Sequence, residues 1–146
     1  MVEGKWLPPG SDIEPALFLR HAIFNLDIDH IDPLAWQALA LYEGTPVGTG
    51  RIWWEDGSFM LGFIGVLPKY RGRGFGDFLV RLLLFKAQQH NAVKIAMKAS
   101  PVMTPFFQKY GFMPVDDQPT DGEQLLMLDG QSIVLDACLG CKRKDC

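Results

Sequence analysis

Three glycines alternate between Gly72 and Gly76, and an arginine precedes each of the first two. Glycine lets the backbone turn sharply and leaves N–H groups uncovered, which suits phosphate oxygens where a loop leads into a helix. Guanidinium groups suit the same ligand because they donate paired hydrogen bonds to phosphate. The sequence therefore predicts a phosphate-binding loop, made up of Arg71, Gly72, Arg73, Gly74 and Gly76.

Two common nucleotide-binding motifs do not fit this loop. The dinucleotide fingerprint needs a glycine three residues after its second glycine, where Asp77 stands here. No Gly-Lys-Ser or Gly-Lys-Thr follows, as a P-loop requires. The loop binds phosphate in another setting, or it is only a turn that joins a strand to a helix.

The elements on either side must position this loop. Apolar periodicity and turn residues predict a helix, three strands, the loop with its helix, a strand, a helix and a strand. Their ranges are 14–25, 36–42, 47–54, 59–66, 77–90, 93–99, 101–110 and 124–128, with 112–115 as a partner for the last strand. Asp56-Gly57 is typical of a tight hairpin turn, and Gly111 of a left-handed helix end. The fold class is α/β (α+β), with a mixed, mostly antiparallel central sheet flanked by helices.

Two apolar faces are expected on the first two helices. The first face contains Leu17, Phe18, Ala22 and Ile23. The second, broader face contains Phe75, Phe78, Leu79, Leu82, Leu83 and Phe85. Val80 and Leu84 fall beside that face, so a homodimer contact through them is one alternative.

Length and charge exclude several classes of function. The 146 residues fit a single compact domain. A net charge of −3 argues against a nucleic-acid partner, which would need a basic surface. No apolar stretch approaches the ~20 residues of a membrane span, and no signal peptide is evident. A soluble cytoplasmic protein is expected.

Two motifs resemble the GNAT acetyltransferase family. Residues 64–76, Ile-Gly-Val-Leu-Pro-Lys-Tyr-Arg-Gly-Arg-Gly-Phe-Gly, are similar to its acyl-CoA signature, and Arg71, Gly74 and Gly76 fill the core positions. Residues 106–112, Phe-Phe-Gln-Lys-Tyr-Gly-Phe, are similar to the end of its last core helix. Residues 47–51, together with Asp29 and Asp32, resemble the ElaA-like branch. The resemblance spans about residues 17–128.

The resemblance implies roles for the loop and for the strand before it. The loop amides would hold the CoA pyrophosphate through Arg71, Gly72, Arg73, Gly74, Phe75 and Gly76. Ile64 and Val66 would pair with the pantetheine arm, with the Ile64 amide facing the thioester carbonyl. An N–H at a developing oxyanion contributes on the order of 3 kcal/mol to catalysis. Acetyl-CoA is the implied co-substrate.

The proton-transfer groups depart from the family pattern. Phe107 stands where the family often has a tyrosine that protonates the departing thiolate, so Tyr110, one helical turn on, is the candidate acid. A thiol with a pKa near ~8.5 can also leave without an acid. No carboxylate lies in 59–66, so Glu55 is the candidate base, with Asp29, Asp32 and Asp117 as alternatives.

Asp29 and Asp32 lie in an acidic loop that could receive a cationic acceptor. Arg51 could pair with an acceptor carboxylate or with one of these aspartates, and the sequence leaves both possibilities open. The acceptor-binding group is therefore Asp29, Asp32 and Arg51.

The three cysteines fall in the last nine residues. Cys138 and Cys141 have the spacing of half a zinc site, and Cys146 could add a third thiolate, but the fourth ligand is unassigned. We prefer the interpretation that residues 131–146 form a reduced, mobile tail that binds no metal. Residues 1–130 are then a single acyl-CoA-binding domain.

These features predict an acetyl-CoA-dependent N-acetyltransferase, in which a primary amine attacks the thioester directly in a ternary complex. One alternative is a CoA-binding regulatory or degenerate module that has lost the chemistry. Another is a thiol or metal sensor that responds through the cysteine tail.

Overall fold

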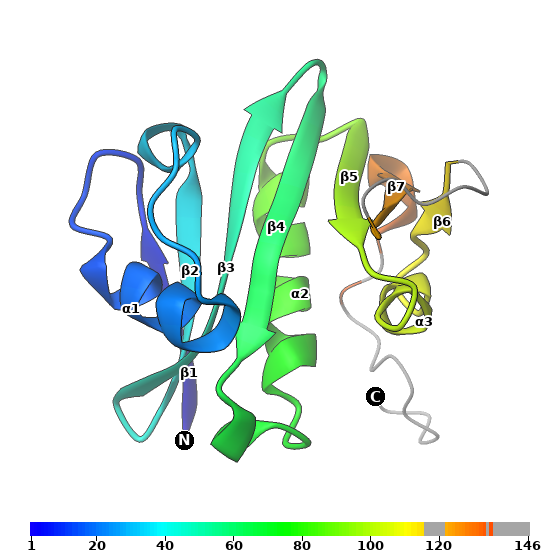
Figure 1. Cartoon of the computed structure of the whole chain (residues 1–146). Helices are drawn as coiled ribbons and strands as arrows, with labels where there is room; N and C mark the ends of the chain where they lie inside the picture. Colours follow the sequence, from blue (N-terminus) through cyan, green and yellow to red (C-terminus); the bar gives the residue numbers. More distant parts are fainter. Residues whose placement is uncertain (116–121, 134, 136–146) are drawn as a thin grey trace. The chain divides into compact units, whose positions relative to one another are not determined.

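The computed structural model describes residues 1–115, 122–133 and 135, and it has a mixed α/β fold (Figure 1). The strands of this part of the chain are β1 (Val2–Leu7), β2 (Trp36–Tyr42), β3 (Thr45–Glu55), β4 (Ser58–Val66), β5 (Lys94–Ala99), β6 (Met113–Pro114) and β7 (Gln124–Asp129). The α-helices are α1 (Glu14–Phe24), α2 (Phe75–Gln89) and α3 (Thr104–Gln108). Short 3₁₀ turns cover Asp32–Leu34, Pro68–Tyr70 and Gly130–Ser132. The predicted fold class is confirmed.

The chain divides into two compact units. The first contains Met1–Trp54 and Leu61–Leu83, and its strands follow the order β1-β2-β3-β4. The second contains Glu55–Met60 and the described residues from Leu84 onward, and its strands follow the order β5-β7-β6. The predicted division at residue 130 stays a prediction.

Strand β1 is an element that the sequence reasoning missed. It pairs antiparallel with β2, from Val2 opposite Tyr42 to Leu7 opposite Gln37. Of its six residues only Leu7 is buried, and Glu3, Gly4 and Lys5 are residue types that strands disfavour, so the sequence of β1 gives only a weak strand signal. The three predicted strands are therefore joined by a fourth, which pairs with β2 at the edge of the sheet.

Two tight turns join β2, β3 and β4. Asp56 and Gly57 have φ values of 49° and 82°, as the predicted hairpin turn requires. Glu43 and Gly44 adopt the same sign of φ, at 52° and 79°. Because this turn needs only two residues, β3 begins at Thr45, earlier than predicted.

Helix α1 has the predicted range but buries a different face. Its Glu14 N–H is accepted by the Asp12 carboxylate at 3.0 Å, and Asn25 ends it with φ of 56°. The buried side chains are Ala16, Leu19 and Arg20, and they are joined in the core of this unit by Leu7 and Leu39. Phe18, predicted to be buried, is 72% exposed, and Ala22 is exposed as well. The predicted buried face of α1 was wrong because the prediction did not allow for a buried arginine, Arg20.

Helix α2 packs against strands that carry glycine. A Cβ at Gly48 would lie 2.9 Å from Leu79 Cδ1, and one at Gly50 would lie 3.0 Å from Leu83 Cδ1. Figure 1 shows α1 in front of the strands of the first unit and α2 behind them.

Within α2, Val80 and Leu84 are at most 2% exposed, so the predicted dimer contact through them is wrong. Phe85, predicted to be buried, is 47% exposed. Both errors come from the width of the apolar face, which left its centre ambiguous.

The second unit has β7 between its neighbours. β5 pairs with it from Lys94 opposite Asp129 to Ala99 opposite Gln124, and Met113 of β6 lies opposite Met127. The predicted pairing of 112–115 with the last strand is thus confirmed. Helix α3 is shorter than predicted, and Gly111 follows it with φ of 102°. Among the described residues, no helix is long and apolar enough to cross a membrane.

Candidate functional site

The glycine loop forms an open cradle at the start of α2. Gly72 and Gly74 have φ values of 78° and 86°, and no heavy atom lies within 4 Å of a Cβ built on either. Phe78 N–H donates to the Gly74 carbonyl at 3.0 Å, which begins the helical ladder. The first turn of a helix presents backbone N–H groups that have no carbonyl four residues back, and in α2 this turn begins at Phe75. Together with the helix dipole, they favour an anion.

The two loop arginines differ in how they are held. Arg71 Nε donates to the Val66 carbonyl at 3.0 Å, which ties the loop to the end of β4. The Arg73 guanidinium carbon lies 5.6 Å from the Tyr70 ring centroid and 5.7 Å from that of Tyr42. Both arginines are exposed, so their charge is available to a ligand in solvent.

Strand β4 leads into this loop and carries the other predicted CoA residues. Val66 is buried, and Ile64 is half-buried. Between them, a Cβ at Gly65 would come within 2.9 Å of both Ile23 Cγ2 and Phe24 Cζ, so α1 covers the strand here. Leu67 N–H then bonds the Val47 carbonyl at 2.8 Å, which keeps the strand end beside β3.

Asp32 is the centre of a buried ionic cluster, made up of Arg20, Asp29, Asp32, Gln37 and Arg51. Asp32 is 1% exposed. It accepts hydrogen bonds from Arg20 at 2.6 and 2.8 Å, from Gln37 at 2.9 Å, from Arg51 at 3.0 Å and from the Asp29 N–H at 2.9 Å. Burial alone would raise the pKa of Asp32, but these donors and the two positive charges hold it well below its usual 3.8.

Asp29 binds Arg51 through both carboxylate oxygens, at 2.7 and 2.9 Å. Partial burial raises its pKa, whereas the bond and charge of Arg51 and the Ile31 N–H lower it, with a net lowering from 3.8. Of the two possibilities for Arg51, the structure has the pairing with the aspartates. The two arginines balance the two carboxylates, so the formal charge of the cluster is zero.

This arrangement distinguishes the three predicted acceptor residues. The Asp32 side chain is inaccessible and that of Arg51 is 3% exposed, whereas that of Asp29 is 32% exposed. Arg20 and Gln37 were missed by sequence reasoning. The signal for Arg20 was that it directly follows the apolar run 16–19 of α1. The signal for Gln37 was its position within an otherwise apolar strand.

The candidate acid and base belong to the second unit. Tyr110 is 7% exposed, and its ring lies 5.7 Å from that of Phe106 in an edge-on contact. Phe107, at the family's tyrosine position, is 5% exposed. Glu55 is exposed at the end of β3.

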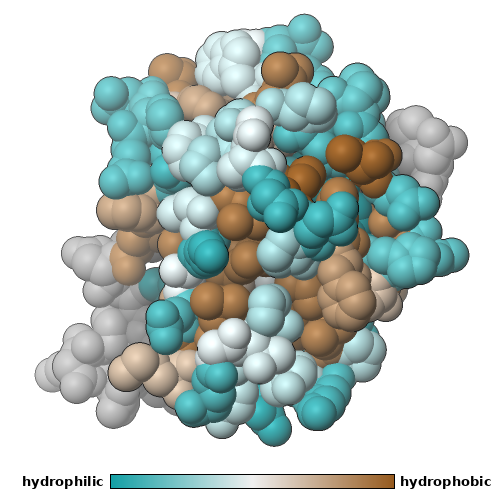
Figure 2. Space-filling view, turned by 90° about the vertical axis from the view of Figure 1, so that its left-hand side faces the viewer, coloured by the Kyte–Doolittle hydropathy of each residue, from teal (hydrophilic) through white to brown (hydrophobic). Residues whose placement is uncertain are grey.

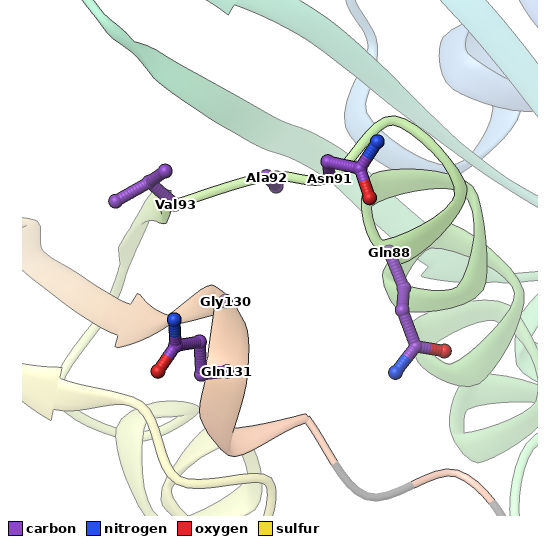
Figure 3. Close-up of a pocket in the computed structure, with 6 residues that line it drawn as sticks. All are labelled: Gln88, Asn91, Ala92, Val93, Gly130 and Gln131. Carbon is purple, nitrogen blue, oxygen red and sulfur yellow. The ribbon is translucent and has the colours of Figure 1, made fainter.

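A pocket of about 240 Å³ in the second unit involves none of the predicted residues (Figure 3). It is lined by Gln88, Asn91, Ala92, Val93, Gly130 and Gln131. Its polar side chains are neutral amides, so it offers no acid, base or nucleophile.

Within the described ranges, no three His, Cys, Asp or Glu side chains are grouped to hold a metal ion. Cys138, Cys141 and Cys146 lie outside the described residues, as does Asp117. Their predicted roles stay predictions.

The model of the acetyltransferase (GNAT) family matches residues 5–112. An acyl-CoA N-acyltransferase from Pseudomonas aeruginosa superposes with a TM-score of 0.78 at 16% identity, covering 87% of this chain and 99% of that one. Escherichia coli ElaA gives 0.75 at 22% identity, with coverage of 87% and 99%.

A further similar structure, a GNAT family acetyltransferase from Elizabethkingia anophelis, has acetyl-CoA bound. Its TM-score is 0.72 at 19% identity, covering 88% of this chain and 97% of that one. No curated protein matches the sequence.

Proposed function

Because the chain belongs to the GNAT acetyltransferase family, we propose that it is an acetyl-CoA-dependent N-acetyltransferase acting on a primary amine of a small molecule or peptide. The observation that carries this proposal is the open cradle at the start of α2, where Gly72 and Gly74 have positive φ values and open space in place of a side chain. Its ligand is the pyrophosphate of acetyl-CoA, bound by residues 71–76. A cytoplasmic location is part of the same proposal.

In the proposed reaction, the neutral acceptor amine attacks the thioester carbonyl carbon. The C–N bond forms, the C–S bond breaks, and CoA leaves as the thiolate, while the proton lost by the nitrogen goes to a base. The Ile64 N–H stabilises the oxyanion, and Val66 aligns the pantetheine arm. Every cysteine lies at or beyond 138, so direct attack in a ternary complex is preferred to an acetyl-cysteine route.

Three residues complete the assignment. Glu55 is proposed as the base, since its exposed carboxylate can act through water. Tyr110 is proposed as the acid that protonates the thiolate. Among the predicted acceptor residues, Asp29 offers the accessible carboxylate. Arg51 donates hydrogen bonds to both of its oxygens, and the Asp32 N–H donates to one of them.

Thiol release from acetyl-CoA with a panel of amines tests this function. The panel contains a polyamine, an amino acid, a peptide with a free N-terminus and a lysine peptide with a blocked N-terminus. One class of amine should raise thiol release far above hydrolysis. Tyr110→Phe and Glu55→Gln should each lower kcat about 100-fold with acetyl-CoA affinity unchanged. Tight binding of acetyl-CoA without stimulation by any amine would instead favour the CoA-binding regulatory module.

A further inference from the structure

Phe63 has an unusual backbone conformation in the middle of β4. Its φ is 49°, in the left-handed region that residues other than glycine rarely adopt. The chain places glycine on one side of it, at Gly62, and Ile64 on the other. A residue in this conformation interrupts the regular alternation of N–H groups along a strand, as in β-bulges. The N–H affected first along the chain is that of Ile64.

The side chain of Phe63 is held from several sides. The guanidinium carbon of Arg51 lies 4.4 Å from its ring centroid, and that of Arg20 lies 4.8 Å away. The ring of Phe24 on α1 lies 5.9 Å away. Cations over an aromatic face are attracted by its quadrupole, and the attraction is stronger where water is excluded.

The two arginines are themselves fixed. Their side chains are 1% and 3% exposed, and Asp32 bonds both of them. Arg20 is also bonded to Gln37 at 3.3 Å, and Arg51 to Asp29. Neither guanidinium can move away from the ring without breaking buried charge-assisted hydrogen bonds.

We propose that Phe63 is a positioning residue, whose ring is clamped by Arg20 and Arg51 so that β4 turns the Ile64 N–H towards the thioester carbonyl of bound acetyl-CoA. This inference rests on the proposed function. A glycine at 63 would permit the same φ but would not specify it. The two arginines fix this φ by holding the ring of Phe63. The buried ionic cluster then contributes to catalysis as well as to stability.

The test follows the carbonyl stretch of acetyl-CoA, isotope-labelled at the carbonyl carbon, by difference infrared spectroscopy. In the wild-type complex the band should lie at lower frequency than in free acetyl-CoA, because the Ile64 N–H polarises the carbonyl. Phe63→Leu removes the ring and should return the band towards the free position. It should also lower kcat for thiol release about 100-fold, with acetyl-CoA affinity within about threefold. Phe63→Tyr keeps the ring and should retain the shifted band.

Phe59→Leu is the matched control, since it makes the same change on the same strand at a ring that lies 5.8 Å from His90. It should leave the band unchanged. Should Phe63→Leu fail to fold, Arg51→Lys keeps the charge but loses the planar fork, and the same loss of shift is expected. A shifted band in the folded leucine or lysine variant would overturn the clamp while leaving the proposed function intact. Absence of acetyl-CoA binding by the wild type would overturn both.

Discussion

Asp32 is the residue on which the buried cluster depends, because both arginines bond it. Asp32→Asn would take from buried Arg20 the carboxylate that it bonds, while Arg51 would keep its bonds to Asp29. Removing one partner of a buried ion pair costs about 3–5 kcal/mol, so the free energy of unfolding should fall by that order. Chemical denaturation measures it. Asp27→Asn, at a side chain that is 89% exposed, is the control and should change little.

The same cluster predicts how stability depends on pH. The pKa values of Asp29 and Asp32 are lower in the folded chain than the 3.8 of an unfolded one. The unfolded chain therefore takes up protons first, and stability present above about pH 4 is lost as the pH falls through the folded pKa values. The wild-type free energy of unfolding should decline across this acid range, more steeply than that of Asp32→Asn. Equal slopes would contradict the account.

At the scale of elements, β4 and α1 depend on the absence of a side chain at Gly65. A methyl group there would come within 2.9 Å of Ile23 and Phe24. Gly65→Ala should lower the free energy of unfolding by about 1–3 kcal/mol, because both side chains of α1 would have to shift to admit the methyl group. Gly4→Ala is the comparison, since its methyl group would meet the flexible end of Leu82 at 2.9 Å and the Phe78 ring at 3.1 Å, on an edge strand that can shift outward. A smaller loss is expected there, and equal losses would argue against close packing at Gly65.

Local signals predicted most of these elements. The Asp56-Gly57 turn, the range of α1 and the glycine loop each depend on residues close together in the chain. Strand β1 could not be predicted from its own residues, because as an edge strand it buries only Leu7. Its existence depends on pairing with β2, which lies some 35 residues away.

The residues of the candidate site also differ in whether local sequence could predict them. The loop residues were found because their type and spacing are a local motif. The ionic cluster joins Arg20 to Asp32 across 12 positions and Asp32 to Arg51 across 19. An isolated aspartate in an acidic loop looks solvated, so its burial becomes evident only when both arginines are in place. Phe63 gave no sequence signal, since its φ is imposed by those distant partners.

At the scale of the whole molecule, the proposed roles are distributed over both units. The first contains residues 64–76 and the ionic cluster, and the second contains Glu55 and Tyr110. Figure 2 shows that one side of the molecule mixes apolar and polar surface, and the exposed apolar side chains of the first unit include Phe18 and Leu34. Because this surface is not uniformly charged, net charge alone does not identify the acceptor, and the amine panel is needed to identify it.

Calorimetric titration of acetyl-CoA into the wild type, Gly74→Ala and Gly10→Ala is the most direct test of the central claim. Gly10 and Gly74 have matching φ values of 84° and 86°, and both have open space where a Cβ would stand. The two variants therefore carry the same backbone strain, but only Gly74→Ala adds a methyl group to the cradle. The account predicts that Gly10→Ala binds as tightly as the wild type and Gly74→Ala at least about tenfold more weakly, or ~1.4 kcal/mol. Equal binding by both variants, or none by the wild type, would contradict it.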